Sequence, residues 1–226
     1  MIRALFEEAR KHESSIIFID EIDSLCSARS EGESESTRRV KTEFLVQMEG
    51  VGKGGGRVLV LGATNIPWGL DQAVRRRFEK RIYISLPDFE ARRYMLERKI
   101  KEVPHSVTPQ QFDQIAQYID GYSGSDIEVL AKDAAMEPLR FAQQTDKFQI
   151  VQDGGMQKFM PVDPRSQVGG NIVQNNLYTL PDNSLVLPPV SQNDFMISTK
   201  RSKASVSQED LDEFIEWTSQ FGEDGS

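Results

Sequence analysis

Two adjacent carboxylates follow directly on a run of large apolar residues. The run Ile16 to Ile19 ends at Asp20 and Glu21. A short, continuous apolar run of this kind is typical of a strand that is covered on both faces. At the end of such a strand, one carboxylate can hold Mg²⁺ through water and the other can polarise an attacking water. The alternative is that the two acids solvate or cap a turn, since short motifs have many false matches.

A second apolar run ends in a hydroxyl and an amide. Val58 to Leu61 lead through Gly62 and Ala63 to Thr64 and Asn65. Parallel α/β sheets bind ligands at the carboxyl ends of their strands, so these side chains have the same predicted setting as the acids. An amide there can orient an attacking water and touch a γ-phosphate. The alternative is that Asn65 makes a turn before Pro67.

Three consecutive arginines follow the second run. Arg75 to Arg77 precede Phe78, and a third strand is expected at 82–86. Arginine stabilises the spread negative charge of a phosphoryl-transfer transition state, and it often does so from a neighbouring subunit. The alternative is a solvated basic edge, which is the common reading of an isolated charge cluster.

The elements that must position these residues alternate between helix and strand up to about residue 86. The residues Ile2, Leu5, Phe6 and Ala9 mark one face of a first helix, and the range 34–50 forms a second helix with Val40, Phe44 and Met48 on one face. Helices that alternate with strands predict a parallel α/β sheet.

Past Pro87 the sequence is mainly helical. Helix starts are predicted at Asp88, at Thr108 with a capping-box Gln111, and at Ser123 with Asp126. Pro138 is expected to kink or end the third of these helices. Short strand-like pieces separated by Gly, Pro and Asn turns predict a β insertion at about 147–189, and a final helix is expected at about 207–221.

The stretches IIFIDEID, LGATN, RRRF and GYSGSDI, in this order and spacing, resemble the AAA ATPases of the meiotic clade. Within the clade the chain is most similar to the vacuolar protein sorting class, which disassembles ESCRT-III filaments. The resemblance implies an α/β fold, with an incomplete P-loop NTPase parallel sheet. This part of the AAA large domain would occupy residues 1–86, and a small helical lid domain with a β insertion would occupy 87–226.

The resemblance also implies roles for the residues at the strand ends, with ATP and Mg²⁺ as cofactors. Asp20 would hold Mg²⁺ through water, in the manner of a Walker B aspartate. Glu21 would be the base for the hydrolytic water, and Asn65 would be the sensor residue beside the γ-phosphate.

Other roles implied by the resemblance involve a neighbouring subunit or the substrate. Arg76 and Arg77 would be arginine fingers that act on ATP held by the next subunit. Gly124 and Ser125 would lie against the adenine end of the nucleotide. The second pore loop would comprise 31–35 with Arg38 and Arg39.

A phosphate-binding GxxxxGK[ST] loop is absent from the sequence. The stretch GVGKGGG at 50–56 has the wrong spacing, and no Ser or Thr follows its lysine. The sequence therefore fits the C-terminal portion of such an ATPase, and we expect no ATP hydrolysis by the chain alone. Two alternatives stay open: a truncated, non-catalytic partner that docks on intact subunits, and a chain shortened by a misplaced start codon.

The resemblance implies a homo-oligomer, with a hexamer expected, that acts on ESCRT-III subunits and binds an activator protein on the β insertion. It places the protein in the cytoplasm, peripherally at endosomal membranes. A microtubule-severing AAA relative is a rival reading. The β insertion and the acidic balance argue against it, because a severing enzyme must engage acidic tubulin tails.

Composition sets outer limits on function. Lys and Arg number 27 against 35 Asp and Glu, and the net charge of −8 argues against nucleic-acid binding by the chain as a whole. The single cysteine, Cys26, excludes an internal disulfide and suits a reducing compartment. His12 and His105 lack metal-ligand neighbours in the sequence. Asp23 is expected to cap the next segment, with the positioning of an arginine as the alternative.

Overall fold

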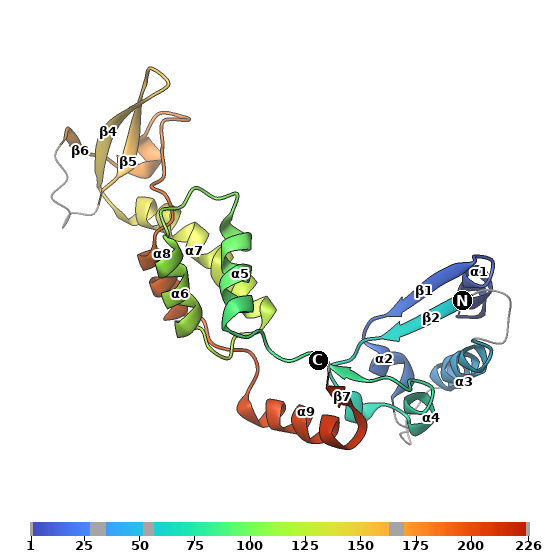
Figure 1. The fold of residues 1–226 in the computed structure, drawn as a ribbon. Coiled ribbons are helices and arrows are strands. Elements are labelled where there is room, and N and C mark those ends of the chain that lie inside the picture. Colours follow the sequence, from blue (N-terminus) through green and yellow to red (C-terminus); the bar gives the residue numbers. More distant parts are fainter. Residues whose placement is uncertain (1, 28–34, 52–56, 163–169, 225–226) are drawn as a thin grey trace. The chain divides into compact units, whose positions relative to one another are not determined.

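The computed structural model describes residues 2–27, 35–51, 57–162 and 170–224, which fall into two compact units (Figure 1). The first unit comprises Met1–Ile84 together with Asp212–Ser226, and the second comprises Ser85–Leu211. The predicted boundary at 86/87 assigned the whole of 87–226 to the lid. In the structure, the C-terminal residues from Asp212 onward pack with the first unit instead.

A two-stranded parallel sheet forms the centre of the first unit. Strands β1 (Ser14–Ile19) and β2 (Arg57–Gly62) run in register from Ser14 opposite Arg57 to Ile19 opposite Gly62. The helices of this part are α1 (Ile2–Ala9), α2 (Ile22–Cys26), α3 (Glu35–Glu49) and α4 (Gln72–Arg75). The predicted alternation of helices with parallel strands is therefore confirmed, including the helix expected at 34–50.

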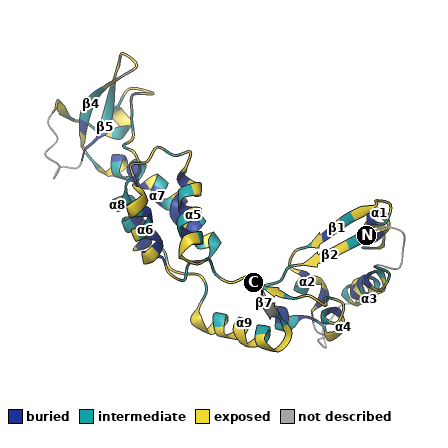
Figure 2. Cartoon of the chain, in the orientation of Figure 1, coloured by how far each residue is buried: buried dark blue, intermediate teal, exposed yellow. Residues whose placement is uncertain are grey.

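The sheet is covered on one face. Ile17 points into a core that also contains Phe6 of α1 and Phe44 of α3, whose rings meet edge to face with centroids 6.1 Å apart. On the other face, Ile16 is 66% exposed and Phe18 is 64% exposed. Figure 2 shows exposed segments along β1. Strands covered on both faces were expected, and this prediction is wrong for the described residues, because no described helix packs on the second face.

The third predicted strand is short and pairs elsewhere. Instead of 82–86, strand β3 covers Ile82–Tyr83 and pairs in parallel with β7 (Glu223–Asp224). Helix α9 (Gln208–Phe221) leads into β7, and Phe214 of this helix contacts Trp68 and Tyr83, with ring centroids 5.1 and 5.8 Å apart. These aromatic contacts explain why the C-terminal residues belong to the first unit.

Helices dominate the second unit. They are α5 (Phe89–Ile100), α6 (Pro109–Tyr118), α7 (Gly124–Gln144) and α8 (Gln192–Thr199), and their core includes Leu96, Ile115, Ile127, Leu130 and Phe195. The predicted starts are confirmed, since Asp88 caps α5 and capping boxes open α6 and α7. Helix α7 does not end at Pro138, because buried residues on both sides, Ala134 and Ala142, hold it in the core.

A small antiparallel sheet follows α7. Strand β4 (Lys147–Asp153) lies between β5 (Met156–Pro161) and β6 (Ile172–Gln174), as predicted for the β insertion. The later strand-like pieces of the sequence form a 3₁₀ turn, Leu177–Thr179, and isolated bridges such as Phe159 with Leu185. None of the helices in the described parts of the chain is long and apolar enough to cross a membrane.

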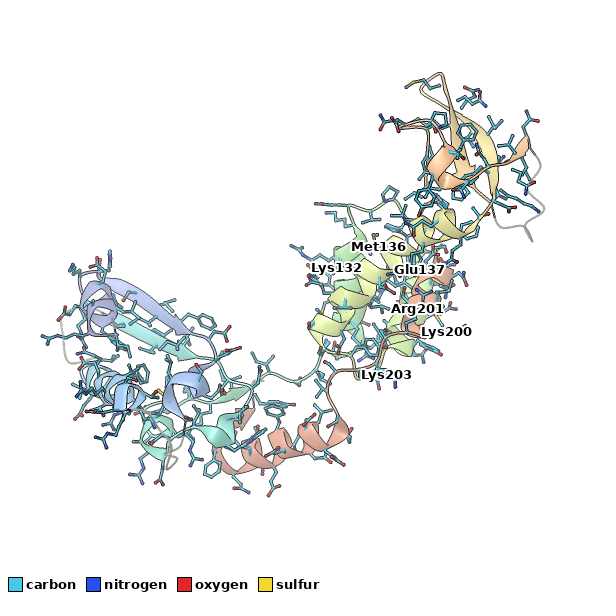
Figure 3. The ribbon with its side chains drawn as sticks, turned by 180° about the vertical axis from the view of Figure 1, so that it is seen from behind. Lys132, Met136, Glu137, Lys200, Arg201 and Lys203 are labelled. Carbon is cyan, nitrogen blue, oxygen red and sulfur yellow. The ribbon has the colours of Figure 1, made fainter. Side chains whose placement is uncertain are left out.

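A buried carboxylate links α7 to the chain after α8 (Figure 3). The Glu137 side chain, only 7% exposed, accepts hydrogen bonds from Arg140 and, at 2.5 Å, from Nη1 of Arg201. Arg140 also pairs with Asp133 at 2.6 Å, and that hydrogen bond lowers the pKa of the Asp133 carboxyl. A carboxylate this buried depends on its partners, because desolvation penalises the charge.

We expect Arg201→Met to lower the free energy of unfolding of the second unit by about 1–2 kcal/mol, because it removes a charged hydrogen bond from buried Glu137. Adding Glu137→Gln in the same chain should recover part of this loss, since the uncompensated charge disappears. Urea titration followed by circular dichroism measures both. A double variant less stable than Arg201→Met would contradict the explanation.

Candidate nucleotide-hydrolysis site

The acids and the amide singled out in the sequence follow β1 and β2 at the same edge of the sheet. The strands are parallel and end opposite one another at Ile19 and Gly62, so Asp20 and Glu21 leave the sheet beside Thr64 and Asn65. Asp20, Glu21 and Asn65 are exposed to solvent at this edge. Because the carboxyl edge of a parallel sheet is where α/β proteins bind ligands, we take it as the candidate site.

Backbone hydrogen bonds join the two loops at this edge. The amide of Ala63 donates to the carbonyl of Ile19 at 2.9 Å, and the amide of Ile22 donates to the carbonyl of Ala63 at 3.0 Å. Gly62 fits closely at the same place, because a Cβ there would lie 3.1 Å from Ile22 and 3.3 Å from Phe78. The acids and the amide are therefore held at a fixed separation by the backbone between them.

A side-chain bond reinforces this link. The Thr64 hydroxyl donates to a carboxylate oxygen of Asp23 at 2.5 Å and accepts from the amide of Ile66 at 3.0 Å. Asp23 does not act as the expected cap, since helix α2 has no side-chain cap at its start. The residues on either side of Asn65 are thus fixed to the loop that carries Glu21. Sequence reasoning missed this pair, because the two residues are 41 positions apart.

We expect Thr64→Val to lower the free energy of unfolding of the first unit by about 1–2 kcal/mol, since both hydrogen bonds are lost at constant shape. Thr64→Ser keeps the hydroxyl and should restore most of the stability. Urea unfolding followed by tryptophan fluorescence measures the change. A valine variant as stable as the parent, together with a destabilised serine variant, would show that the methyl group, and not the bond to Asp23, matters.

The backbone at Glu21 is unusual. Its φ of 48° and ψ of 47° lie in the left-handed region, which residues other than glycine seldom adopt. The amide of Glu21 donates to one oxygen of Asp20 at 2.9 Å, and the amide of Ser24 donates to the carbonyl of Glu21 at 2.9 Å. This left-handed residue turns the chain sharply directly after β1, between Asp20 and helix α2.

The donor set of Asp20 fits a hydrated Mg²⁺ ion. Magnesium prefers carboxylate oxygens and keeps several of its waters. One oxygen of Asp20 accepts from Glu21, and the exposed carboxylate remains accessible to water. No group of three or more His, Cys, Asp and Glu side chains gathers within the described ranges, so a fully protein-ligated metal site is not found there.

The three arginines have different surroundings in the structure. Arg75 ends α4 and lies over the ring of Phe221, with 5.2 Å between its guanidinium carbon and the ring centroid. Arg77 contacts Glu49 at 3.4 Å across an exposed pair. Arg76 is exposed. The run is tied to the core of the first unit through Phe78, which stacks on Phe44 of α3 with centroids 6.5 Å apart.

Gly124 and Ser125 lie at the start of α7 in the second unit. The helix is capped by Ser123, whose amide and hydroxyl donate to the carboxylate of Asp126 at 2.9 and 2.8 Å. Ser205 donates to the same carboxylate from its amide and its hydroxyl. Burial would raise the pKa of Asp126, but these hydrogen bonds lower it below its usual value. The role of Gly124 and Ser125 toward an adenine stays a prediction.

Part of the predicted second pore loop lies outside the described residues. Of this stretch, Glu35, Arg38 and Arg39 of α3 are described, and Glu35 forms an exposed ion pair with Arg39 at 2.7 Å. Most of the glycine-rich stretch 50–56 also lies outside them, and its described residues, Gly50 and Val51, follow α3.

The parallel sheet, with acids at its carboxyl edge, and the separate helical unit define an α/β protein with a ligand-binding edge. The chain belongs to the ATPase family associated with various cellular activities (AAA), whose model matches residues 1–86. The AAA+ lid domain matches residues 110–151, and the Vps4 C terminal oligomerisation domain matches residues 166–222.

Curated relatives are similar over the whole chain. It is 44% identical to "Protein SUPPRESSOR OF K(+) TRANSPORT GROWTH DEFECT 1" of Arabidopsis thaliana and 43% identical to "Vacuolar protein sorting-associated protein 4B" of Mus musculus. Each match covers 100% of this chain and 52% of the relative, so the chain spans about half the length of these relatives. The solved FIGL-1 AAA domain has a TM-score of 0.76 at 36% identity, over 98% of this chain and 62% of that one.

Proposed function

We propose that this chain is the portion of an AAA ATPase that carries the hydrolytic acids, the sensor amide, the arginine fingers and the lid. The enzyme would use ATP hydrolysis to disassemble ESCRT-III filaments at endosomal membranes. The observation that carries the proposal is the 43% identity to vacuolar protein sorting-associated protein 4B along the entire chain. The position of Asp20, Glu21 and Asn65 at one edge of the sheet supports it.

In this mechanism the chain orients water and stabilises charge. Glu21 accepts the proton of the attacking water, and Asn65 holds that water in line with the γ-phosphate. Asp20 binds the water shell of Mg²⁺, which when present neutralises charge on the phosphates. The links between Thr64 and Asp23 and between Ala63 and Ile19 keep the loops of Glu21 and Asn65 from moving apart.

Assembly into a ring, with six subunits expected, would bring Arg76 and Arg77 to the ATP of a neighbour. The match of residues 166–222 to an oligomerisation domain supports self-assembly, and the exposure of Arg76 leaves its guanidinium available. The β insertion presents exposed apolar side chains, among them Met156, Ile172 and Tyr178, which an activator protein could cover.

The test uses a chimera that joins residues 1–226 of this chain to the portion of the mouse relative outside the matched region. We expect the chimera to hydrolyse ATP, to be retained on immobilised ESCRT-III tails and to shorten ESCRT-III filaments when ATP is added. The isolated chain should show no steady-state turnover. If the isolated chain hydrolyses ATP, and Glu21→Gln abolishes that hydrolysis, the expectation that the isolated chain is inactive is wrong.

A microtubule-severing function is the second candidate, because the chain is 40% identical to spastin of Danio rerio over 224 residues. Retention of the chimera on tubulin, without retention on ESCRT-III tails, would favour it. A non-catalytic partner role is tested by mixing the isolated chain with the intact mouse relative. If the ATPase rate and the assembly state of the mouse relative stay unchanged, that role is ruled out.

A further inference from the structure

One arginine outside the predicted finger pair bridges two distant segments of the first unit. Nη1 of Arg81 donates to the carbonyl of Phe221 at 2.7 Å, and Nη2 donates to the carbonyl of Arg75 at 2.8 Å. Residues 81 and 221 are 140 positions apart, so this single guanidinium connects the arginine run to the C-terminus. The forked donors of arginine suit two carbonyls in this way, whereas lysine offers only a point charge.

The same two segments meet through a ring and through the backbone. Arg75 lies over the ring of Phe221, and β3, directly after Arg81, pairs with β7, directly after Gly222. Gly222 fits tightly here, because a Cβ would lie 2.8 Å from the Thr218 side chain and 3.0 Å from the Thr218 carbonyl. Arg81, Phe221 and the β3–β7 bridge therefore form one clamp around the turn that carries Arg76 and Arg77.

On its other side the turn is held by Phe78, which stacks on Phe44, and by the exposed pair of Arg77 with Glu49. Helix α4 is only four residues long, and it holds the amides of Arg76 and Arg77 by bonds of 3.1 and 2.9 Å to Gln72 and Val74. A helix this short is unstable alone, and its last carbonyls need external donors. Arg81 supplies such a donor to Arg75, and its positive charge is favourable at a helix C-terminus.

We infer that Arg81 and Phe221 are positioning residues for the arginine fingers. They hold the turn 76–77 so that its guanidinium groups point in a fixed direction. This inference rests on the proposed function for the role of the fingers, but the clamp itself is a property of the described residues. A trans-acting finger must meet a transition state within a fraction of an ångström, so a loosened turn lowers the rate of the chemical step.

The first experiment measures backbone amide exchange in the isolated chain. In Arg81→Met and in Phe221→Ala, the amides of 76–81 should exchange faster, while those of β1 and β2 stay as protected as before. Arg3→Met is the matched control, because Arg3 forms an exposed ion pair with Glu7 on α1. Exchange at 76–81 that is unchanged in both clamp variants would overturn the inference.

The second experiment measures ATPase kinetics in the chimera. Arg81→Met should lower kcat by roughly ten- to a hundredfold with KM for ATP nearly unchanged, because the fingers act on the transition state. Arg81→Lys, which keeps the charge and one donor, should recover part of the rate. A parent chimera without turnover contradicts the proposed function. If the parent chimera is active and Arg81→Met turns over ATP at the parent rate, the clamp is contradicted. An Arg81→Met variant whose KM and kcat fall together also contradicts it.

Discussion

Glu21→Gln in the chimera is expected to reduce ATP turnover by about 10²–10⁴-fold, the usual contribution of a general base. Glutamine has the same shape as glutamate and tolerates the left-handed backbone equally, but its amide does not accept a proton from water. ATP binding and ring assembly should persist, since Asp20 and the subunit surfaces are untouched. Turnover is measured by phosphate release, ATP binding by equilibrium dialysis, and assembly by light scattering.

Glu13→Gln is the matched control for this experiment. Glu13 precedes β1, is exposed and lies at the opposite end of the strand from Glu21. Its variant should turn over ATP at the parent rate. If Glu21→Gln keeps its turnover, Glu21 is not the general base. If the variant loses ATP binding together with turnover, Glu21 contributes to the binding of Mg²⁺ and ATP.

Arg76→Ala should reduce kcat of the chimera by about 10³–10⁵-fold, the range found for arginine fingers. Arg77→Ala should cost less, because Arg77 is partly engaged by Glu49. KM for ATP should change little, as the guanidinium contacts the transition state rather than the bound nucleotide. Initial rates over a range of ATP concentrations separate the two parameters.

A mixture of two inactive variants tests whether the finger acts in trans. Arg76→Ala subunits keep Glu21, and Glu21→Gln subunits keep Arg76, so a mixed ring contains interfaces with both groups intact. Turnover should reappear on mixing, to a level below that of the parent. A mixture as inactive as its components would contradict a finger that reaches into the neighbouring subunit.

Local signals in the sequence were sufficient for β1, β2 and most of the helices, and for the edge that carries the candidate site. The change from apolar residues to acids after Ile19 located the end of β1, and the capping residues located the starts of α5, α6 and α7. Parallel pairing of β1 and β2 then placed Asn65 at the same edge as Asp20 and Glu21. The chemical roles of these three residues stay predictions.

Features that depend on distant contacts could not be predicted in this way. A strand that is covered on one face has the same apolar composition as one covered on both, so the exposure of Ile16 and Phe18 left no signal. The sequence predicted a final helix at about 207–221 but not the partners of its Phe214, which are Trp68 and Tyr83. Nothing in the sequence indicated the role of Arg81, because its acceptors are backbone carbonyls, which every residue has.

The uncovered face of the β1–β2 sheet affects the solubility of the isolated chain. Ile16, Phe18, Leu59 and Leu61 present to water a contiguous surface that a second polypeptide can cover. Because exposed apolar surface favours association, sample concentration should be varied in experiments on the isolated chain.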